Sequence, residues 1–146
     1  MDSQKVLFVD TDVLIGILHE SLDSGELTTI FSQYDQIATT SANIYELYFG
    51  YYQLEYSKQK VSEEKLKHEK QALNNLVQNL IVYNMTSQTA IKSAEIYHQL
   101  VSKGKKIENF DCIIASIILK SSYKDLLTGN TNHFKRIKEL NLLTLP

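Results

Sequence analysis

The apolar residues of this chain follow two alternating patterns, short runs rich in β-branched residues and longer stretches with helical spacing. The first run, KVLFVD at residues 5–10, is apolar almost throughout, as expected of a strand covered on both faces. Similar short runs occupy residues 36–39, 80–83, 125–127 and 142–145. Helical spacing predicts helices from about Val13, over 25–33, after Ser41, and over 62–78, 88–102, 109–122 and 134–139. This alternation is typical of an α/β fold with a parallel sheet.

No feature of the sequence divides the chain into parts. It has no repeat and no linker, and its single proline is the last residue, Pro146. A length of 146 residues with 43% apolar and 22% charged residues is ordinary for one globular domain, so we expect a single domain over residues 1–146. The N-terminal segment has an acid at its second residue and too short an apolar run for a signal peptide or a membrane span. It therefore predicts a cytoplasmic protein without membrane association.

Two aspartates follow the first predicted strand, at the edge of a parallel sheet where the loops converge and ligands bind. Asp10 comes directly after Phe8 and Val9, so its carboxylate leaves a buried strand and needs a partner. We therefore assign Asp10 to a functional site, with a purely structural role in the turn as the alternative. For Asp12 we favour the structural role, as the N-cap of the next helix.

Asp111 begins a helix that is otherwise a nearly unbroken apolar run, CIIASIIL. An isolated buried carboxylate is costly unless it is paired or bound to a metal ion. The helix dipole is the alternative explanation, because with Asn109 as the N-cap Asp111 lies in the first turn, where negative charge is favourable. The dipole contributes typically below about 1 kcal/mol, which would not offset deep burial. We therefore assign Asp111 to the site as well.

Glu46 lies on the long helix predicted after Ser41, between two aromatic stripes. A capping box with Asn43 as the N-cap and Glu46 as the third helical residue explains this glutamate as well as a functional role does, so both interpretations stay open here. Gly50, one turn further along, leaves space beside the carboxylate that a phosphate could use.

Three carboxylates are the ligand set that hard divalent cations prefer. Mg²⁺ or Mn²⁺ is usually held by a few carboxylates together with water and substrate phosphate, so we expect Asp10, Glu46 and Asp111 to be metal ligands. The single cysteine, Cys112, lies in an apolar run and receives no role. The histidines are too scattered for a competing zinc site: His19, His68, His98 and His133.

Four sequence blocks resemble the PIN-domain family, especially the VapC-type toxins of bacterial and archaeal toxin–antitoxin pairs. VLFVDTDVLI resembles the family's opening strand and D-T-[ND]-x-L-I turn, ANIYELYFGYY its E-L-x-x-G block, and IENFDCIIASIIL its D-x-x-I-A block. These blocks match the family's catalytic acids to Asp10, Glu46 and Asp111. LLTGNTNHFKRI resembles the closing T-x-N-x-x-x-F block. Each block alone is weak, but four blocks in order form a fairly specific signature.

The resemblance implies a three-layer α/β/α sandwich with a central, mainly parallel sheet of four to five strands. It also implies a divalent-metal-dependent ribonuclease that hydrolyses single-stranded RNA and is neutralised by a small antitoxin protein. Supporting roles fall to residues within the matched blocks: Thr11, Asp12, Thr128 and Asn130. Many relatives carry a fourth acid where Asn130 or His133 stands, and its absence argues against a complete second metal site.

Two alternatives remain at this point. VDTDVL also resembles the D-x-D opening of haloacid-dehalogenase-type phosphatases, in which Asp10 would be a covalent nucleophile and Asp12 a general acid. The chain lacks the acidic pair expected late in that family and places Asp111 in a helix. The second alternative is a PIN module that binds RNA or protein without catalysis.

Charge and aromatic pattern bear on partners. A net charge of −2 does not indicate a nucleic-acid-binding protein, and for the lysine groups within 58–70 and 103–106 we favour a solvated helix face and a helix C-terminus. The two aromatic stripes of the long helix cannot both face one core. Tyr48 and Tyr51 form one stripe, and the other predicts a homodimer or antitoxin contact: Tyr45, Phe49, Tyr52 and Tyr56.

Overall fold

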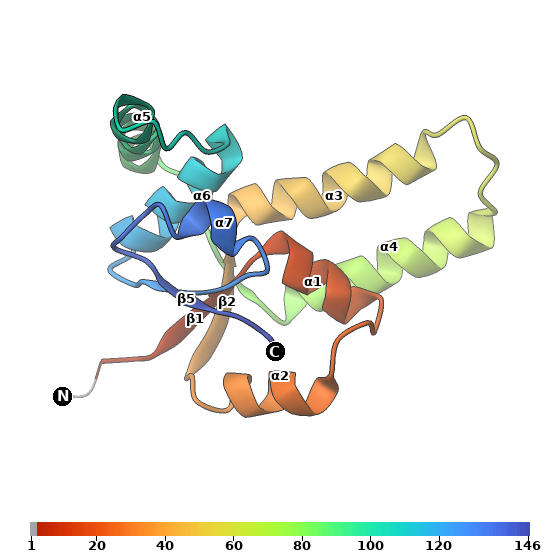
Figure 1. The fold of residues 1–146 in the computed structure, drawn as a ribbon. Helices are drawn as coiled ribbons and strands as arrows, with labels where there is room; N and C mark the ends of the chain where they lie inside the picture. The colour runs from red at the N-terminus through yellow and green to blue at the C-terminus, as the bar shows by residue number, and fades with distance from the viewer. Residues whose placement is uncertain (1–2) are drawn as a thin grey trace.

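Five parallel strands form the centre of the computed structural model, which describes residues 3–146 (Figure 1). Their order is β3-β2-β1-β4-β5, and all neighbouring pairs are parallel. The strands are β1 (Val6–Val9), β2 (Gln36–Thr40), β3 (Ile81–Tyr83), β4 (Asp125–Leu127) and β5 (Asn141–Leu143). The predicted fold class is confirmed, with five strands in a wholly parallel sheet.

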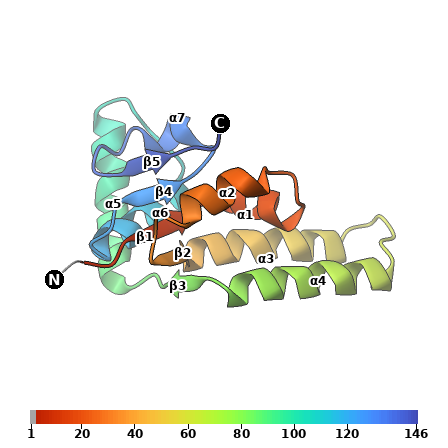
Figure 2. The same ribbon diagram turned by 90° about the horizontal axis from the view of Figure 1, so that it is seen from below.

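Helices cover both faces of the sheet, as Figure 2 shows from below. One face carries α1 (Thr11–Leu18), α2 (Ser24–Phe31), α3 (Ser41–Glu55) and α4 (Glu63–Gln78). The other carries α5 (Ser87–Ser102), α6 (Asn109–Lys120) and the short α7 (Thr131–Phe134). The α3–α4 pair lies side by side and extends beyond the sheet in both views. No helix within residues 3–146 has the length and hydrophobicity needed to cross a bilayer.

The alternation of side chains along β1 explains the two cores. Val6 and Phe8 pack among the residues of α5 and α6, whereas Leu7 and Val9 pack among those of α1, α3 and α4. All four are almost completely buried. A strand with apolar residues on both faces gains burial on both sides, which is why VLFV at Val6–Val9 is apolar without interruption.

The structure corrects three predicted helix starts. Thr40, not Asn43, caps α3: the Thr40 hydroxyl accepts the N–H of Asn43, whose side chain accepts the N–H of Thr40. The capping box between Asn43 and Glu46 is therefore not formed, and this alternative explanation of Glu46 falls away. Asp10 rather than Asp12 caps α1.

The third corrected start is that of α6, where Glu108 rather than Asn109 is the N-cap. Asp111 stays in the first turn of the helix, as predicted. The last helix also differs, because α7 spans Thr131–Phe134 instead of the predicted 134–139. In the sequence TNHFKRIKEL the apolar Phe134, Ile137 and Leu140 keep helical spacing, and all three are buried. Only Phe134 lies in the helix, because the chain from residue 135 to 139 forms turns instead.

Candidate active site

Asp10 lies at the carboxyl end of β1, in the centre of the sheet, and is 6% exposed. Three groups hold its carboxylate. The N–H of Thr11 (2.9 Å) and the side-chain amide of Asn43 (3.0 Å) donate to Oδ1, and the hydroxyl of Thr128 (2.7 Å) donates to Oδ2. Burial outweighs these hydrogen bonds and raises the pKa of Asp10 from 3.8 to about 6, with smaller contributions from Asp12 and Asp111.

Glu46 faces the same end of the sheet from the second turn of α3. Its Oε1 accepts the hydroxyl of Thr11 at 2.7 Å, and Thr11 in turn accepts the side-chain amide of Asn43 at 2.9 Å. Desolvation raises the pKa of Glu46, and the nearby charge of Asp111 raises it further. Glu46 is half-buried.

Asp111 approaches from the N-terminus of α6, and its side chain is 14% exposed. Nδ1 of His133 lies 2.8 Å from its Oδ2, and the Asn130 amide donates to the same oxygen at 3.3 Å. Because an ionised carboxylate can only accept, Nδ1 of His133 carries the proton in this contact. Burial raises the pKa of Asp111, and the hydrogen bond and charge of His133 partly oppose that rise.

One hydrogen-bond network joins the three acids. Thr128 links two of them, because its hydroxyl donates to Asp10 and accepts the N–H of Asn130, whose amide donates to Asp111. Thr11 and Asn43 complete the connection from Asp10 to Glu46. The acids are also close enough for the charge of Asp111 to raise the pKa of both Asp10 and Glu46.

A hard divalent cation fits this set of donors by chemistry, since carboxylate oxygens from three elements meet at one edge. Within residues 3–146, however, no three acidic, histidine or cysteine side chains form a ready-made cation site. Glu46 is held by Thr11, and Asp111 by His133 and Asn130. Binding of a cation would therefore require these two carboxylates to exchange hydrogen bonds for metal contacts.

Asp12 performs the structural task of clamping two loops. Its Oδ1 accepts the N–H of Val13 and its Oδ2 accepts the N–H of Gly129, both at 2.8 Å. A Cβ on Gly129 would lie 2.5 Å from that oxygen, so only glycine permits this contact. The clamp joins the turn after β1 to the loop after β4, which carries Thr128 and Asn130.

Sequence reasoning missed two residues of the network. Asn43 is 1% exposed and its amide reaches both Asp10 and Thr11, a role that became visible only when Thr40 proved to be the cap. His133, one of the four histidines scattered along the sequence, contacts Asp111. The signal for His133 in the sequence is its place in the block LLTGNTNHFKRI, which resembles the closing block of the family.

A family model matches the part of the chain that forms this site. The model described as "PIN domain" matches residues 7–140, a range that includes all three acids. The chain belongs to the PIN-domain family. This membership replaces the haloacid-dehalogenase interpretation, and the two backbone hydrogen bonds of Asp12 give no support to a general acid at that position.

Solved structures share the fold of this PIN domain. VapBC2 from Rickettsia felis, bound to a DNA fragment from its promoter, has a TM-score of 0.78 and 24% identity and covers 97% of this chain and 99% of its own. VapBC-1 from nontypeable Haemophilus influenzae has 0.77 and 20%, with 95% and 97% covered. DNA-bound VapBC from Salmonella typhimurium has 0.76 and 19%, with 96% and 98% covered. No curated protein sequence gives a significant match.

An apolar groove of about 300 Å³ begins beside Glu46 of the PIN domain. It lies between α1, α3 and α4, and its lining includes Leu47, Tyr51 and Leu73. Gly50 also lines it, and nothing lies within 4 Å of the position where its Cβ would be. The open helix surface beside the carboxylate, expected from the glycine, is therefore present.

The two aromatic stripes of α3 differ in exposure as predicted. Tyr51 is 7% exposed and belongs to the core, whereas Tyr45, Phe49 and Tyr56 are 56%, 58% and 82% exposed. Tyr45 stacks on Phe110 of α6 with ring centroids 5.3 Å apart. The exposed stripe therefore continues across α3 to the start of the helix that carries Asp111.

Proposed function

We propose that this PIN-domain protein is a divalent-metal-dependent endoribonuclease that hydrolyses phosphodiester bonds of single-stranded RNA. The observation that carries the proposal is the meeting of three desolvated carboxyl groups, on Asp10, Glu46 and Asp111, in one network at the carboxyl edge of the sheet. Their mutual repulsion and burial oppose ionisation, and a cation would offset both. The network contains no serine or cysteine nucleophile.

The three carboxylates would hold Mg²⁺ or Mn²⁺ in this proposal. When bound, the ion supplies a Lewis acid that polarises the scissile phosphate and lowers the pKa of a water molecule. Thr11, Asn43 and Thr128 orient the carboxylates by the hydrogen bonds described above. Asn130 and His133 hold Asp111 and present polar atoms toward the same edge.

The decisive experiment is cleavage of single-stranded RNA by the purified protein with Mg²⁺ or Mn²⁺ and with chelator. We expect cleavage only with the ion. Asp111→Asn keeps the shape of the side chain but removes a charged ligand, so it should abolish most turnover while circular dichroism shows an unchanged fold. Glu55→Gln, which changes an exposed acid in the last turn of α3 and outside the network, is the matched control.

Full activity of the Asp111→Asn protein would contradict the proposed mechanism. RNA binding that persists with chelator, without cleavage in any divalent metal, would instead identify a non-catalytic PIN module. These two outcomes differ in whether the wild-type protein turns over RNA at all.

We also propose that the protein is the toxin of a VapBC-type pair and acts in the cytoplasm, where a small antitoxin neutralises it. The similar folds of VapBC proteins support this, as does the apolar groove, which would give an apolar antitoxin segment a place beside Glu46. Induced expression should arrest growth, and an adjacent small gene should relieve the arrest when co-expressed. Arrest that persists in an Asp10→Asn protein would contradict a catalytic toxin.

The exposed aromatic stripe supports a homodimer contact in this proposal. Tyr45, Phe49 and Tyr56 are each more than half exposed on one helix, and monomers seldom leave large apolar surfaces uncovered. Sedimentation equilibrium should show a dimer for the wild-type protein and dissociation for Phe49→Ser. A monomeric wild-type protein that keeps the stripe free of antitoxin would remove this part of the proposal.

A further inference from the structure

A cleft with a basic rim and an apolar floor lies between α5 and the chain that follows α7. Glu139 lines it, and so do five cations from both sides: Lys92, Lys103, Lys105, Arg136 and Lys138. Buried apolar residues, including Ile96, Leu100 and Ile137, also line it, and its volume is about 280 Å³. We call this feature the basic cleft.

Positive charge is concentrated around the basic cleft although the chain as a whole is weakly acidic. The segments 103–108 and 135–139 contain six Lys or Arg and two Glu residues, a net charge of +4, against −2 for the whole chain. Within residues 3–146, none of these six cations is in an ion pair, while Lys92 pairs with Glu95 at 3.0 Å. Unpaired cations at this density favour a polyanionic partner.

The two segments that carry this charge also lead into the candidate active site. Nη1 of Arg136 donates to the carbonyl oxygen of Lys106 at 2.7 Å, which ties the segments together. One segment ends at Glu108, the N-cap of the helix that carries Asp111. The other begins just after His133, which contacts Asp111 at 2.8 Å. The basic cleft is thus connected to the three acids by two short stretches of chain.

We propose that the basic cleft binds the single-stranded RNA substrate beyond the nucleotides at the cleaved bond, an inference that rests on the proposed ribonuclease function. Lysine and arginine neutralise backbone phosphates, and an apolar floor can accept a base, so the two features together suit a nucleotide. An acidic peptide would match the charge but offers no reason for the connection to acids that act on a phosphodiester.

Lys103, Lys105 and Lys106 take part in RNA binding in this proposal. From sequence alone they are a solvated helix C-terminus. The structure adds Arg136 and Lys138, 30 residues or more further along the chain, to the same surface. No local pattern of charge could have indicated that the two groups meet.

Binding of a labelled single-stranded oligouridylate, measured by fluorescence anisotropy with chelator so that the RNA stays intact, tests the proposal. The variant is Lys103→Gln/Lys105→Gln/Lys138→Gln, which changes three exposed side chains without known hydrogen bonds and leaves Arg136 in place. The matched control is Lys58→Gln/Lys60→Gln/Lys67→Gln, which removes the same charge near the far end of the α3–α4 pair (Figure 1).

We expect the cleft variant to bind RNA about tenfold more weakly and the control to bind like the wild-type protein. The slope of log affinity against log salt should fall by about 2 in the cleft variant, since each phosphate contact to a single strand contributes about 0.7. With Mg²⁺ or Mn²⁺, cleavage of a dinucleotide too short to reach the cleft should be unchanged, while cleavage of the longer RNA should show a raised KM.

Equal weakening in both triple variants would overturn the proposal, because it would reflect the general field of the protein. Unchanged affinity in the cleft variant would also overturn it. Competition by polyglutamate that is as strong as competition by unlabelled RNA, and is lost in the cleft variant, would assign the cleft to an acidic protein instead. Failure of the ribonuclease proposal is separate: the wild-type protein would then cleave no RNA, whatever the anisotropy shows.

Discussion

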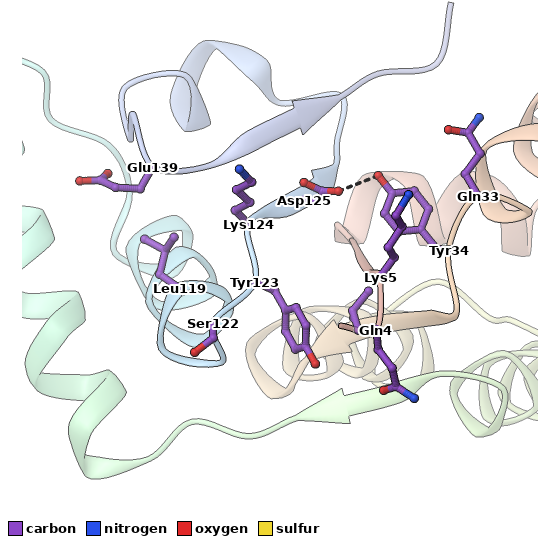
Figure 3. Close-up of a pocket in the computed structure, with 11 residues that line it drawn as sticks. Gln4, Lys5, Gln33, Tyr34, Leu119, Ser122, Tyr123, Lys124, Asp125 and Glu139 are labelled. Carbon is purple, nitrogen blue, oxygen red and sulfur yellow. Dashed lines mark hydrogen bonds between the residues drawn. The ribbon is translucent and has the colours of Figure 1, made fainter. Parts of the chain in front are cut away.

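The two edges of the sheet treat their acids in different ways. At the carboxyl edge, Asp10, Glu46 and Asp111 share one network, burial raises the pKa of each, and the charge of Asp111 further raises the pKa of Asp10 and Glu46. At the amino edge, shown in Figure 3, Asp125 begins β4 beside an open cavity of about 490 Å³, which Glu139 also lines. Asp125 accepts the hydroxyl of Tyr34 at 2.8 Å and the amide of Asn141 at 3.0 Å.

The difference separates a structural acid from acids with a chemical task. Both oxygens of Asp125 are satisfied by neutral donors, so it needs no cation, and its presence together with burial raises the pKa of Tyr34 to about 12. The carboxyl edge instead brings together acids whose ionisation is disfavoured by burial and by the charge of Asp111. This arrangement lowers the stability of the fold, so we attribute it to a chemical role. Cavity volume does not identify the candidate site, because the cavity of about 490 Å³ at the amino edge is larger than the groove of about 300 Å³ beside Glu46.

The largest expected effect contrasts one acid from each edge. Asp10→Asn should lower RNA cleavage by more than about 100-fold, because it removes a proposed metal ligand rather than a residue that only hydrogen-bonds to a ligand. Asp125→Asn should leave cleavage unchanged and reduce stability, since one hydrogen bond is lost. Initial rates and urea unfolding of both proteins test this, and comparable loss of cleavage in both would break the comparison.

The pH dependence of stability should follow Asp10. Its pKa rises from 3.8 to about 6 on folding, so the folded protein binds this proton more tightly than the unfolded chain. The wild-type protein should therefore lose up to about 3 kcal/mol of unfolding free energy as pH rises through that range, and Asp10→Asn should not lose this share. Urea unfolding with chelator measures it.

Asp125→Asn is the control for this experiment, because its carboxyl group lies at the other edge. It should keep the wild-type dependence on pH. Parallel curves for the wild-type protein and Asp10→Asn would show that folding does not raise the pKa of Asp10.

Asn130→Asp tests the missing fourth acid and should have a smaller effect. An added carboxylate beside Asp111 should tighten Mg²⁺ or Mn²⁺ binding by roughly tenfold and raise cleavage at low metal concentration. With chelator the same change should reduce stability, because the amide now donates to Asp111 and an acid would repel it. Asn132→Asp, an exposed neighbour, is the matched control. Identical metal titrations of Asn130→Asp and the wild-type protein would place Asn130 outside the site.

The smallest effect is expected at the amino edge. Tyr34→Phe removes the donor to Asp125 while keeping the ring, which should cost about 1 kcal/mol of unfolding free energy. Cleavage and metal affinity should not change. A measurable loss of cleavage would show that the two edges communicate and that the separation drawn between them is incomplete.

The sequence by itself determined the fold class and the identity of the candidate acids. Periodicity distinguishes strands from helices because burial on one or two faces dictates where apolar residues recur, and VLFV at residues 6–9 is apolar at every position, as a strand buried on both faces requires. Asp10 and Asp111 stood out because a carboxylate at the end of a buried element is costly. Glu46 needed the family resemblance, since a local capping box explained it equally well.

Tertiary structure decided what distant segments do to one another. The N-cap of α3 is Thr40 rather than Asn43, and the side-chain amide of Asn43 donates to Asp10, 33 residues earlier in the chain. His133 contacts Asp111, and the lysines before α6 line the same cleft as Arg136 and Lys138 after α7. Local sequence cannot encode these outcomes, because a hydrogen bond or a charged surface depends on which chain segments the packed sheet brings within reach.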